Sequence, residues 1–189
     1  MRIDKCEIPG VLFIEPKIFS DPRGWFAEIW NKDKYEQAGI EDSFVQDNIS
    51  CSKRGTLRGL HYQKPYTQGK LVFVIQGEVW DVVVDLRIKS PTFKKWKAFK
   101  LTGEGKEQLY IPKGLAHGFC VMSDEAVFQY KCTDKYSPND EKGIRWDDPE
   151  LQIPWPVNDP LVSEKDTKWP FMSGLHGDDF FNEGFTKCL

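Results

Sequence analysis

The 189-residue sequence lacks the features that mark membrane, secreted and nucleic-acid-binding proteins. No apolar run approaches the roughly 20 residues that a membrane-spanning helix needs. The first five residues, MRIDK, lead into no apolar signal core. The formal net charge of −3 supplies no excess of basic residues for a nucleic-acid-binding face. We therefore expect a cytoplasmic protein that binds neither a membrane nor nucleic acid.

Paired cysteines and helical periodicity are also scarce. The five cysteines are scattered and form no CxxC pair, which is typical of reduced packing residues rather than of a disulfide framework. Only residues 32–38 predict a short helix, which Gly39 closes at a position that favours a left-handed cap. No internal repeat or low-complexity segment is present, so neither a helical bundle nor a repeat architecture is expected.

Apolar residues alternate with period two through most of the first 146 residues. The pattern predicts strands over 69–75 and 78–85, joined by a tight hairpin turn at Gln76-Gly77. Further strands are expected over 11–16, 24–30, 44–50, 57–62, 96–101, 108–112, 118–122 and 127–133. Their spacing of about 8–12 residues is typical of a sandwich or barrel. After Trp146, prolines interrupt any ladder, so we expect that stretch to wrap around the barrel.

Residues 112–117 read P-x-G-x-x-H and resemble the second half of the cupin signature. Metal cupins offer two histidines and a glutamate in the first half, whereas here Gln63 replaces the second histidine and Lys70 replaces the glutamate. An ammonium group repels a divalent cation and has no lone pair to donate, so we expect no metal. The fold expected is mostly β: a cupin-like double-stranded β-helix (jelly-roll barrel) with a few short helices. We predict one domain over 1–172 and a peripheral C-terminal tail over 173–189.

Polar residues gather where the interior of such a barrel would otherwise be apolar. Alternation in 57–63 places His61 and Gln63 on one face, and we expect Lys70 on the strand paired with it. Burying these groups is costly unless they are paired or used. His117 also fits the alternative of an ordinary structural histidine. The cluster indicates a site in the mouth of the barrel.

Seven motifs, in order along residues 5–172, resemble the dTDP-4-dehydrorhamnose 3,5-epimerase family. They are DPRGWFAE (21–28), FVQDNIS (44–50), LRGLHYQ (57–63), QGKLV (68–72), IPKGLAHGF (111–119), YKCT (130–133) and SEKD (163–166). Each motif alone is weak, but their order and spacing together are specific. The tail after Met172 falls outside the resemblance.

The resemblance implies an isomerase that needs no cofactor and inverts C3 and C5 of dTDP-4-dehydro-6-deoxy-D-glucose to give dTDP-4-dehydro-L-rhamnose, in rhamnose biosynthesis. Protons next to a keto group are acidic enough for a side-chain base if the enolate oxygen is stabilised. By the resemblance, His61 is the base and Asp166 holds its second ring nitrogen. Lys70 stabilises the oxyanion, and Tyr130 returns a proton from the opposite face.

The resemblance also implies contacts to the nucleotide sugar. The residues are Arg23, Phe26, Glu28, Gln46, Asp47, Asn48, Arg58, Gln63, His117, Tyr136, Glu141 and Lys165. Arginine and lysine suit the diphosphate, because they form charge-assisted hydrogen bonds. Tyr136 resembles the position that stacks on the base, with an ordinary surface tyrosine as the alternative. The family is homodimeric and shares strands between subunits, so Arg23 or Glu28 serves either its own site or the neighbour's.

Three alternatives remain open at this point. The chain is a 3-epimerase or 5-epimerase of a related nucleotide-linked keto-sugar if Tyr130 points differently. A non-catalytic cupin that only binds sugars would be favoured by loss of His61 or Tyr130, yet both are present. A metal-dependent cupin oxygenase or isomerase is opposed by Gln63 and Lys70.

Overall fold

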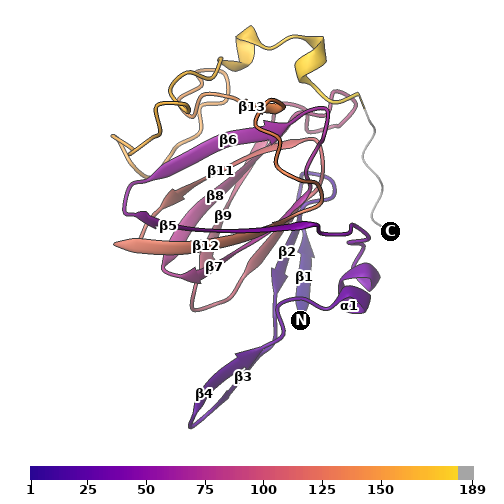
Figure 1. Cartoon of the computed structure of the whole chain (residues 1–189), viewed down its shortest axis with the longest axis vertical. Coiled ribbons are helices and arrows are strands. Elements are labelled where there is room, and N and C mark those ends of the chain that lie inside the picture. The colour runs from indigo at the N-terminus through magenta and orange to yellow at the C-terminus, as the bar shows by residue number, and fades with distance from the viewer. Residues whose placement is uncertain (183–189) are drawn as a thin grey trace.

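A computed structural model describes residues 1–182 of the chain, so Cys188 lies outside the described residues. Two antiparallel sheets face each other across a closed core, which confirms the predicted mostly-β barrel (Figure 1). The strands are β1 (Arg2–Lys5), β2 (Leu12–Glu15), β3 (Ile18–Asp21), β4 (Gly24–Ala27), β5 (Gln46–Lys53), β6 (Leu57–Gln63), β7 (Lys70–Gln76), β8 (Glu78–Asp85), β9 (Trp96–Thr102), β10 (Gln108–Ile111), β11 (Leu115–Val121), β12 (Glu125–Cys132) and β13 (Glu141–Gly143). The helical elements are α1 (Lys32–Gln37), η1 (Met172–Gly174) and η2 (Gly177–Asp179). None of the helices within 1–182 is long and apolar enough to cross a membrane.

The order of the strands interleaves distant parts of the sequence. One sheet runs β1-β2-β10-β7-β12-β5 and the other runs β13-β6-β11-β8-β9. The hairpin β3–β4 forms a third, two-stranded sheet that projects from the barrel at the bottom of Figure 1. Each of the two large sheets therefore combines strands from both halves of the chain.

The predicted strands on either side of the tight turn at Gln76-Gly77 are present, but they do not pair with each other as a hairpin. Strand β7 pairs with β10 and β12, whereas β8 pairs with β11 and β9, so the turn carries the chain from one sheet to the other. Gly77 has φ +84°, a conformation that glycine adopts without strain. The alternation of apolar residues marks a strand but contains no information about its partner, which explains the error.

Some strands were missed or misplaced because the local alternation of apolar residues is too short to reveal them. The short strands β1, β3 and β13 were not expected, and β11 begins at Leu115 rather than at 118. Strand β13 consists of only three residues, too few to show an alternation. Because β13 carries Glu141, this omission affects the site as well as the fold.

Three apolar clusters hold the structure together. The largest lies between the sheets and is centred on Val72, Val83 and Phe128, none of them exposed. A second covers the outer face of the five-stranded sheet, where the proline-rich segment after Trp146 packs through Leu151. The Trp96 indole N–H donates to the Leu151 carbonyl at 2.8 Å. A third cluster docks α1 through the buried Tyr35. Apolar clusters therefore cover both faces of the five-stranded sheet.

The described part of the C-terminal segment, 173–182, also contributes to the second cluster. Phe180 and Phe181 are buried, and the Phe181 N–H donates to the Leu86 carbonyl at 3.0 Å. The Lys64 ammonium reaches the Asp178 carbonyl at 2.7 Å. The rest of the segment lies outside the described residues, so the division of the chain at 172/173 stays a prediction.

Replacing Gly77 by alanine is expected to destabilise the protein by about 2 kcal/mol or more. A left-handed alanine costs roughly 1–2 kcal/mol by itself. Its Cβ would also collide with the Glu125 carbonyl oxygen, a backbone atom that cannot swing away. Gly55→Ala is the matched control, because Gly55 has a similar φ of +79° and no atom within 4 Å of the added Cβ. Urea unfolding of both variants measures the difference, and equal losses would contradict the predicted collision.

Candidate active site

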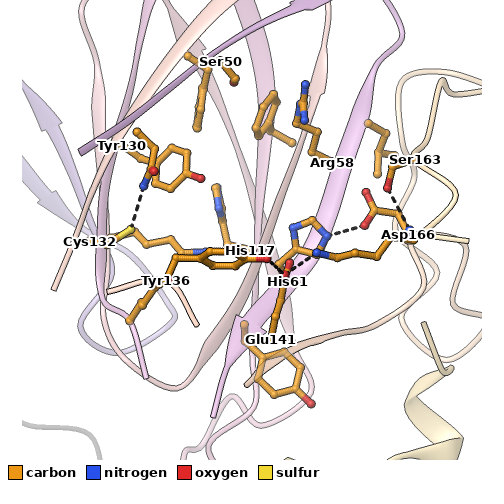
Figure 2. A pocket seen from close by; sticks show the side chains of 18 of the residues that line it. Ser50, Arg58, His61, His117, Tyr130, Cys132, Tyr136, Glu141, Ser163 and Asp166 are labelled. Atoms are coloured by element: carbon orange, nitrogen blue, oxygen red, sulfur yellow. Dashed lines mark hydrogen bonds and ion pairs between the residues drawn. The ribbon is translucent and has the colours of Figure 1, made fainter. Parts of the chain in front are cut away.

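A pocket of about 660 Å³ opens between the two sheets. Its walls come from β5, β7 and β12 on one side and from β6 and β11 on the other, with residues 161–166 closing one edge (Figure 2). Most of the residues implicated by sequence line it. They are Gln46, Asn48, Arg58, His61, Gln63, Lys70, His117, Tyr130, Tyr136, Glu141, Lys165 and Asp166. Twelve side chains from across the chain therefore meet in one cavity.

His61 and Asp166 form a hydrogen-bonded pair on one wall. Strand β6 carries His61, whose Nε2 lies 2.6 Å from an Asp166 carboxylate oxygen. Burial opposes ionisation of Asp166, but the bonds from His61 and the Trp169 indole outweigh it, so the pKa of Asp166 is lowered. An ionised Asp166 accepts a hydrogen bond from Nε2–H, which leaves the lone pair of the neutral ring on Nδ1. The pair has the geometry of an oriented general base.

Lys70 and Tyr130 occupy the opposite wall. The expectation that Lys70 lies on the strand paired with His61 is wrong, because β6 pairs with β11 and β13 whereas β7 belongs to the other sheet. Tyr130, on the neighbouring strand β12, faces His61 across the pocket (Figure 2). Burial lowers the pKa of Lys70 and raises that of Tyr130. The pocket thus has a base on one side and a phenol proton on the other.

The mouth of the pocket is organised by hydrogen bonds from loop 133–140. The Tyr136 hydroxyl and the Lys165 ammonium both bond to Glu141. The Tyr136 N–H donates to Gln46 at 2.8 Å, and the Gln46 amide donates to Asn48 at 2.9 Å (Figure 2 shows Tyr136 and Glu141). These bonds fix the polar rim, with Tyr136 about half exposed above it.

Two of the predicted contact residues have their polar groups already engaged. Gln63 is buried, and its amide bonds to backbone groups of Lys135 and Ser137 at 3.0 and 2.9 Å, so it supports the loop that carries Tyr136. The Arg58 guanidinium donates to the buried Ser52 hydroxyl at 3.1 and 3.2 Å while its side chain stays exposed at the pocket edge.

Four residues implicated by sequence do not line the pocket of their own chain. Asp47 points out of the opposite face of β5 and pairs with Lys131 at 3.0 Å. Glu28 bonds to Asn31 and Lys34 beside α1. The other two, Arg23 and Phe26, are exposed on the projecting hairpin β3–β4. The contact roles inferred for these four residues therefore need a second chain or a different explanation.

The sequence reasoning missed Asp81. This residue lies on β8, is fully buried and accepts a hydrogen bond from His117 Nε2, which lies 2.8 and 3.0 Å from the two carboxylate oxygens. A signal was available, because Asp81 is an acid inside an otherwise apolar strand, VWDVVV over 79–84. A buried carboxylate needs a partner, so its presence there already pointed to a polar interior.

Within residues 1–182, no group of three or more histidine, cysteine, aspartate and glutamate side chains is placed to hold a metal ion. Gln63 and Lys70 occupy the pocket where the cupin pattern would offer ligands. Metal-free activity stays a prediction.

A jelly-roll barrel with a hydrogen-bonded His–Asp pair on one wall of its pocket, and a lysine and a tyrosine on the other, has the groups that an enzyme needs to move protons by acid–base chemistry. The profile of the family described as dTDP-4-dehydrorhamnose 3,5-epimerase matches residues 5–174. The chain belongs to this family and is an isomerase with a cupin-like fold.

Similar proteins agree with that assignment. A dTDP-4-dehydrorhamnose 3,5-epimerase of Shigella flexneri is 55% identical over 168 residues, covering 88% of this chain and 93% of that protein. A crystal structure of a 3,5-epimerase from Legionella pneumophila, in complex with dTDP-4-keto-L-rhamnose, has a TM-score of 0.93 at 47% identity, covering 97% of this chain and 98% of that one. A dTDP-4-dehydrorhamnose 3-epimerase of Streptomyces niveus is 40% identical over 168 residues, covering 88% and 81%.

Asp166→Asn is expected to lower kcat by roughly 10²-fold, since a positioned general base contributes roughly 10²–10⁴-fold. An asparagine neither stabilises the imidazolium nor enforces the Nε2–H tautomer. The control is Asp147→Asn, which removes a carboxylate paired with Arg145 away from the pocket. Steady-state kinetics of both variants test the assignment. A loss of kcat below about fivefold in Asp166→Asn would show that Asp166 does not assist His61 as a base.

Proposed function

We propose that this chain inverts C3 and C5 of dTDP-4-dehydro-6-deoxy-D-glucose to give dTDP-4-dehydro-L-rhamnose, with His61 as base and Tyr130 as acid. The observation that carries the proposal is the position of these two groups on opposite walls of one pocket. Epimerisation removes a proton from one face of a carbon and delivers a proton to the other. A single group on one wall cannot do both.

Proton removal begins at the lone pair of His61. With Nε2–H held by Asp166, Nδ1 takes the proton next to the 4-keto group, and the resulting imidazolium lies beside the Asp166 carboxylate. Negative charge then develops on the 4-keto oxygen. The Lys70 ammonium stabilises that oxygen, and it acts strongly because its surroundings exclude much of the solvent.

Tyr130 completes the inversion from the other side. Burial raises the pKa of the Tyr130 hydroxyl, so the hydroxyl is protonated near neutral pH and able to donate. Once the proton is delivered, the enolate returns to the ketone with inverted configuration. Solvent then takes the proton from the His61 imidazolium and returns one to the Tyr130 phenolate, so the same pair of groups serves C3 and C5 in turn, because both carbons flank the 4-keto carbon.

The nucleotide end of the substrate is assigned to the rim of the pocket. Arg58 and Lys165 supply cations for the diphosphate, although Lys165 also bonds to Glu141. Gln46 and Asn48 offer amides for the sugar or base, and Tyr136 offers an exposed ring for stacking.

We further propose a homodimer in which the hairpin β3–β4 of one protomer reaches the pocket of its partner. Three aromatic residues on this hairpin are largely exposed: Phe19 (51%), Trp25 (59%) and Phe26 (66%). Such a group of exposed apolar side chains is unfavourable in water and typical of a surface that another protein covers. Arg23 on the same hairpin would bring a cation to the diphosphate. The described cysteines are free thiols, which supports a reducing compartment such as the cytoplasm.

The second candidate function is inversion at C3 alone. The 3-epimerase of Streptomyces niveus favours keeping it, because a relative at 40% identity bears that name. Isotope exchange at each carbon separates the two functions, since a 3-epimerase yields no C5-inverted product. A sugar-binding cupin without activity is opposed by the oriented His61–Asp166 pair.

Tyr130→Phe is expected to separate proton removal from inversion. In deuterated water His61 and Lys70 should still form the enolate, so exchange at C3 and C5 should remain within about tenfold of wild type. Inverted product should fall by roughly 10²-fold or more, because the acid on the opposite wall is gone. NMR of one reaction follows both quantities, with His61→Asn as the variant that loses both. Equal losses in Tyr130→Phe would show that Tyr130 is not the acid.

Co-expressing Arg23→Ala with His61→Asn is expected to restore about one quarter of wild-type activity. Random pairing makes half of the dimers mixed, and half of the pockets in a mixed dimer then contain both native residues. Co-expression of His61→Asn with Asp166→Asn is the control, since those residues share a pocket and every pocket stays defective. The absence of complementation in the Arg23 pairing would place Arg23 in its own chain's site or in none.

A further inference from the structure

Trp169 contacts both members of the His61–Asp166 pair, although it lies outside the seven sequence motifs and does not line the pocket. Its indole N–H donates to an Asp166 carboxylate oxygen at 3.3 Å, and the same oxygen accepts the hydrogen bond from His61 Nε2. The indole stands at 68° to the His61 imidazole, with 6.3 Å between the ring centroids. One side chain therefore meets the carboxylate and the ring of the proposed base together.

The backbone on either side of Trp169 is held by hydrogen bonds. The Asp166 N–H donates to the Ser163 carbonyl at 3.0 Å and closes the turn that precedes Trp169. After Trp169, the Arg145 N–H donates to the Pro170 carbonyl at 3.0 Å. The indole thus belongs to an anchored segment, so it is able to restrain the side chains that it contacts.

Gly143 provides the surface on which the indole packs. This buried glycine lies on β13, directly opposite His61 in strand register. A Cβ added to Gly143 would meet atoms of the Trp169 ring at 2.6 and 2.7 Å, closer than real Cβ contacts allow. The ring therefore lies flat against the strand backbone at the one point where it also reaches His61.

The His61–Asp166 pair needs such a restraint because both side chains end in soft torsions. The terminal torsions of aspartate and histidine are broad and roughly twofold, so one hydrogen bond between the two groups leaves the direction of Nδ1 poorly defined. A second donor on the carboxylate oxygen and an aromatic neighbour beside the imidazole restrict both torsions. Proton transfer depends on this geometry, since a misplacement of about 1 Å can cost about 10²-fold in rate.

We propose that Trp169 is a positioning residue of this active site, which fixes the Asp166 carboxylate and the His61 ring so that Nδ1 of His61 faces the substrate carbon. Trp169 acts through these two side chains and does not touch the substrate. The inference rests on the proposed role of His61 as base. The contact between Trp169 and Asp166 does not depend on that role, and it is measurable without turnover.

The first experiment measures kcat and KM in Trp169→Phe and Trp169→Leu. Phenylalanine lacks the N–H but keeps an aromatic face for the Lys165 ammonium, which lies 5.7 Å from the centroid of the indole ring. In Trp169→Phe, kcat should fall by roughly tenfold, as expected for the loss of one hydrogen bond to a charged group, while KM stays within about twofold. Leucine also removes the aromatic face, so KM should rise as well. An unchanged kcat in Trp169→Phe, or a rise in KM alone, would overturn the proposal.

Trp155→Phe is the matched control for this experiment. The Trp155 indole N–H donates to the Trp146 carbonyl at 2.7 Å, and its ring packs against Trp80, away from the pocket. This variant loses an indole hydrogen bond of the same kind, so it should unfold at lower urea concentration while its kcat stays unchanged. Equal losses of kcat in Trp155→Phe and Trp169→Phe would show a general effect of lost stability and would also overturn the proposal.

The second experiment needs no substrate. The chain has seven tryptophans, so the indole N–H signals of ¹⁵N-labelled protein are assignable by single replacements. Asp166→Asn exchanges a charged acceptor for a neutral one, and hydrogen bonds to charged acceptors are shorter and stronger. The Trp169 signal should therefore move upfield in Asp166→Asn, while the Trp155 signal stays in place. An unmoved Trp169 signal would contradict the proposed contact. If the signal moves as expected but the wild-type enzyme turns over no keto-sugar, the contact stands and the proposed function fails.

Discussion

Two sheets that face each other impose the constraint on which the site depends. In the proposed mechanism, proton removal and proton delivery must come from opposite faces of the same carbon, and no single strand or sheet presents side chains on both sides of a ligand. The barrel resolves this by placing His61 on β6 and Tyr130 on β12, in different sheets, with the pocket between them. The two residues lie in different sheets because the chain passes from one sheet to the other at Gly77 and through its longer crossovers.

The same arrangement creates an electrostatic problem. A pocket between two apolar sheets disfavours charge, yet the proposed chemistry needs an ammonium, a carboxylate and an imidazole that becomes charged. The structure pairs the charges locally where it can, as in His61–Asp166 and Lys165–Glu141. The Lys70 ammonium has no such partner among the described residues, so in the proposed mechanism it is free to meet a developing oxyanion. An ion pair in direct contact would have to be broken first.

The projecting hairpin is the feature on which the proposed dimer rests. Its aromatics stay more than half exposed even though the Lys106 ammonium lies 4.1 Å from the centroid of the Trp25 ring, and Arg23 pairs with Asp21 of its own hairpin. Their placement makes physical sense when a second protomer covers the apolar surface and receives the cation. The site then joins residues from two sheets and, in the proposed dimer, from two chains.

The sequence by itself determined the fold class, the family and most of the residues that gather in the pocket. It did so because alternation reports local backbone state and because ordered motifs such as LRGLHYQ and SEKD preserve side-chain identity. Tertiary structure decided which strands pair, so that Lys70 lies opposite His61 rather than beside it. It also decided that Gln63 supports a loop, that Asp47 faces outward and that Asp81 lies beneath His117. Partner choice and burial arise from contacts between residues far apart in the chain, and local alternation carries no record of them.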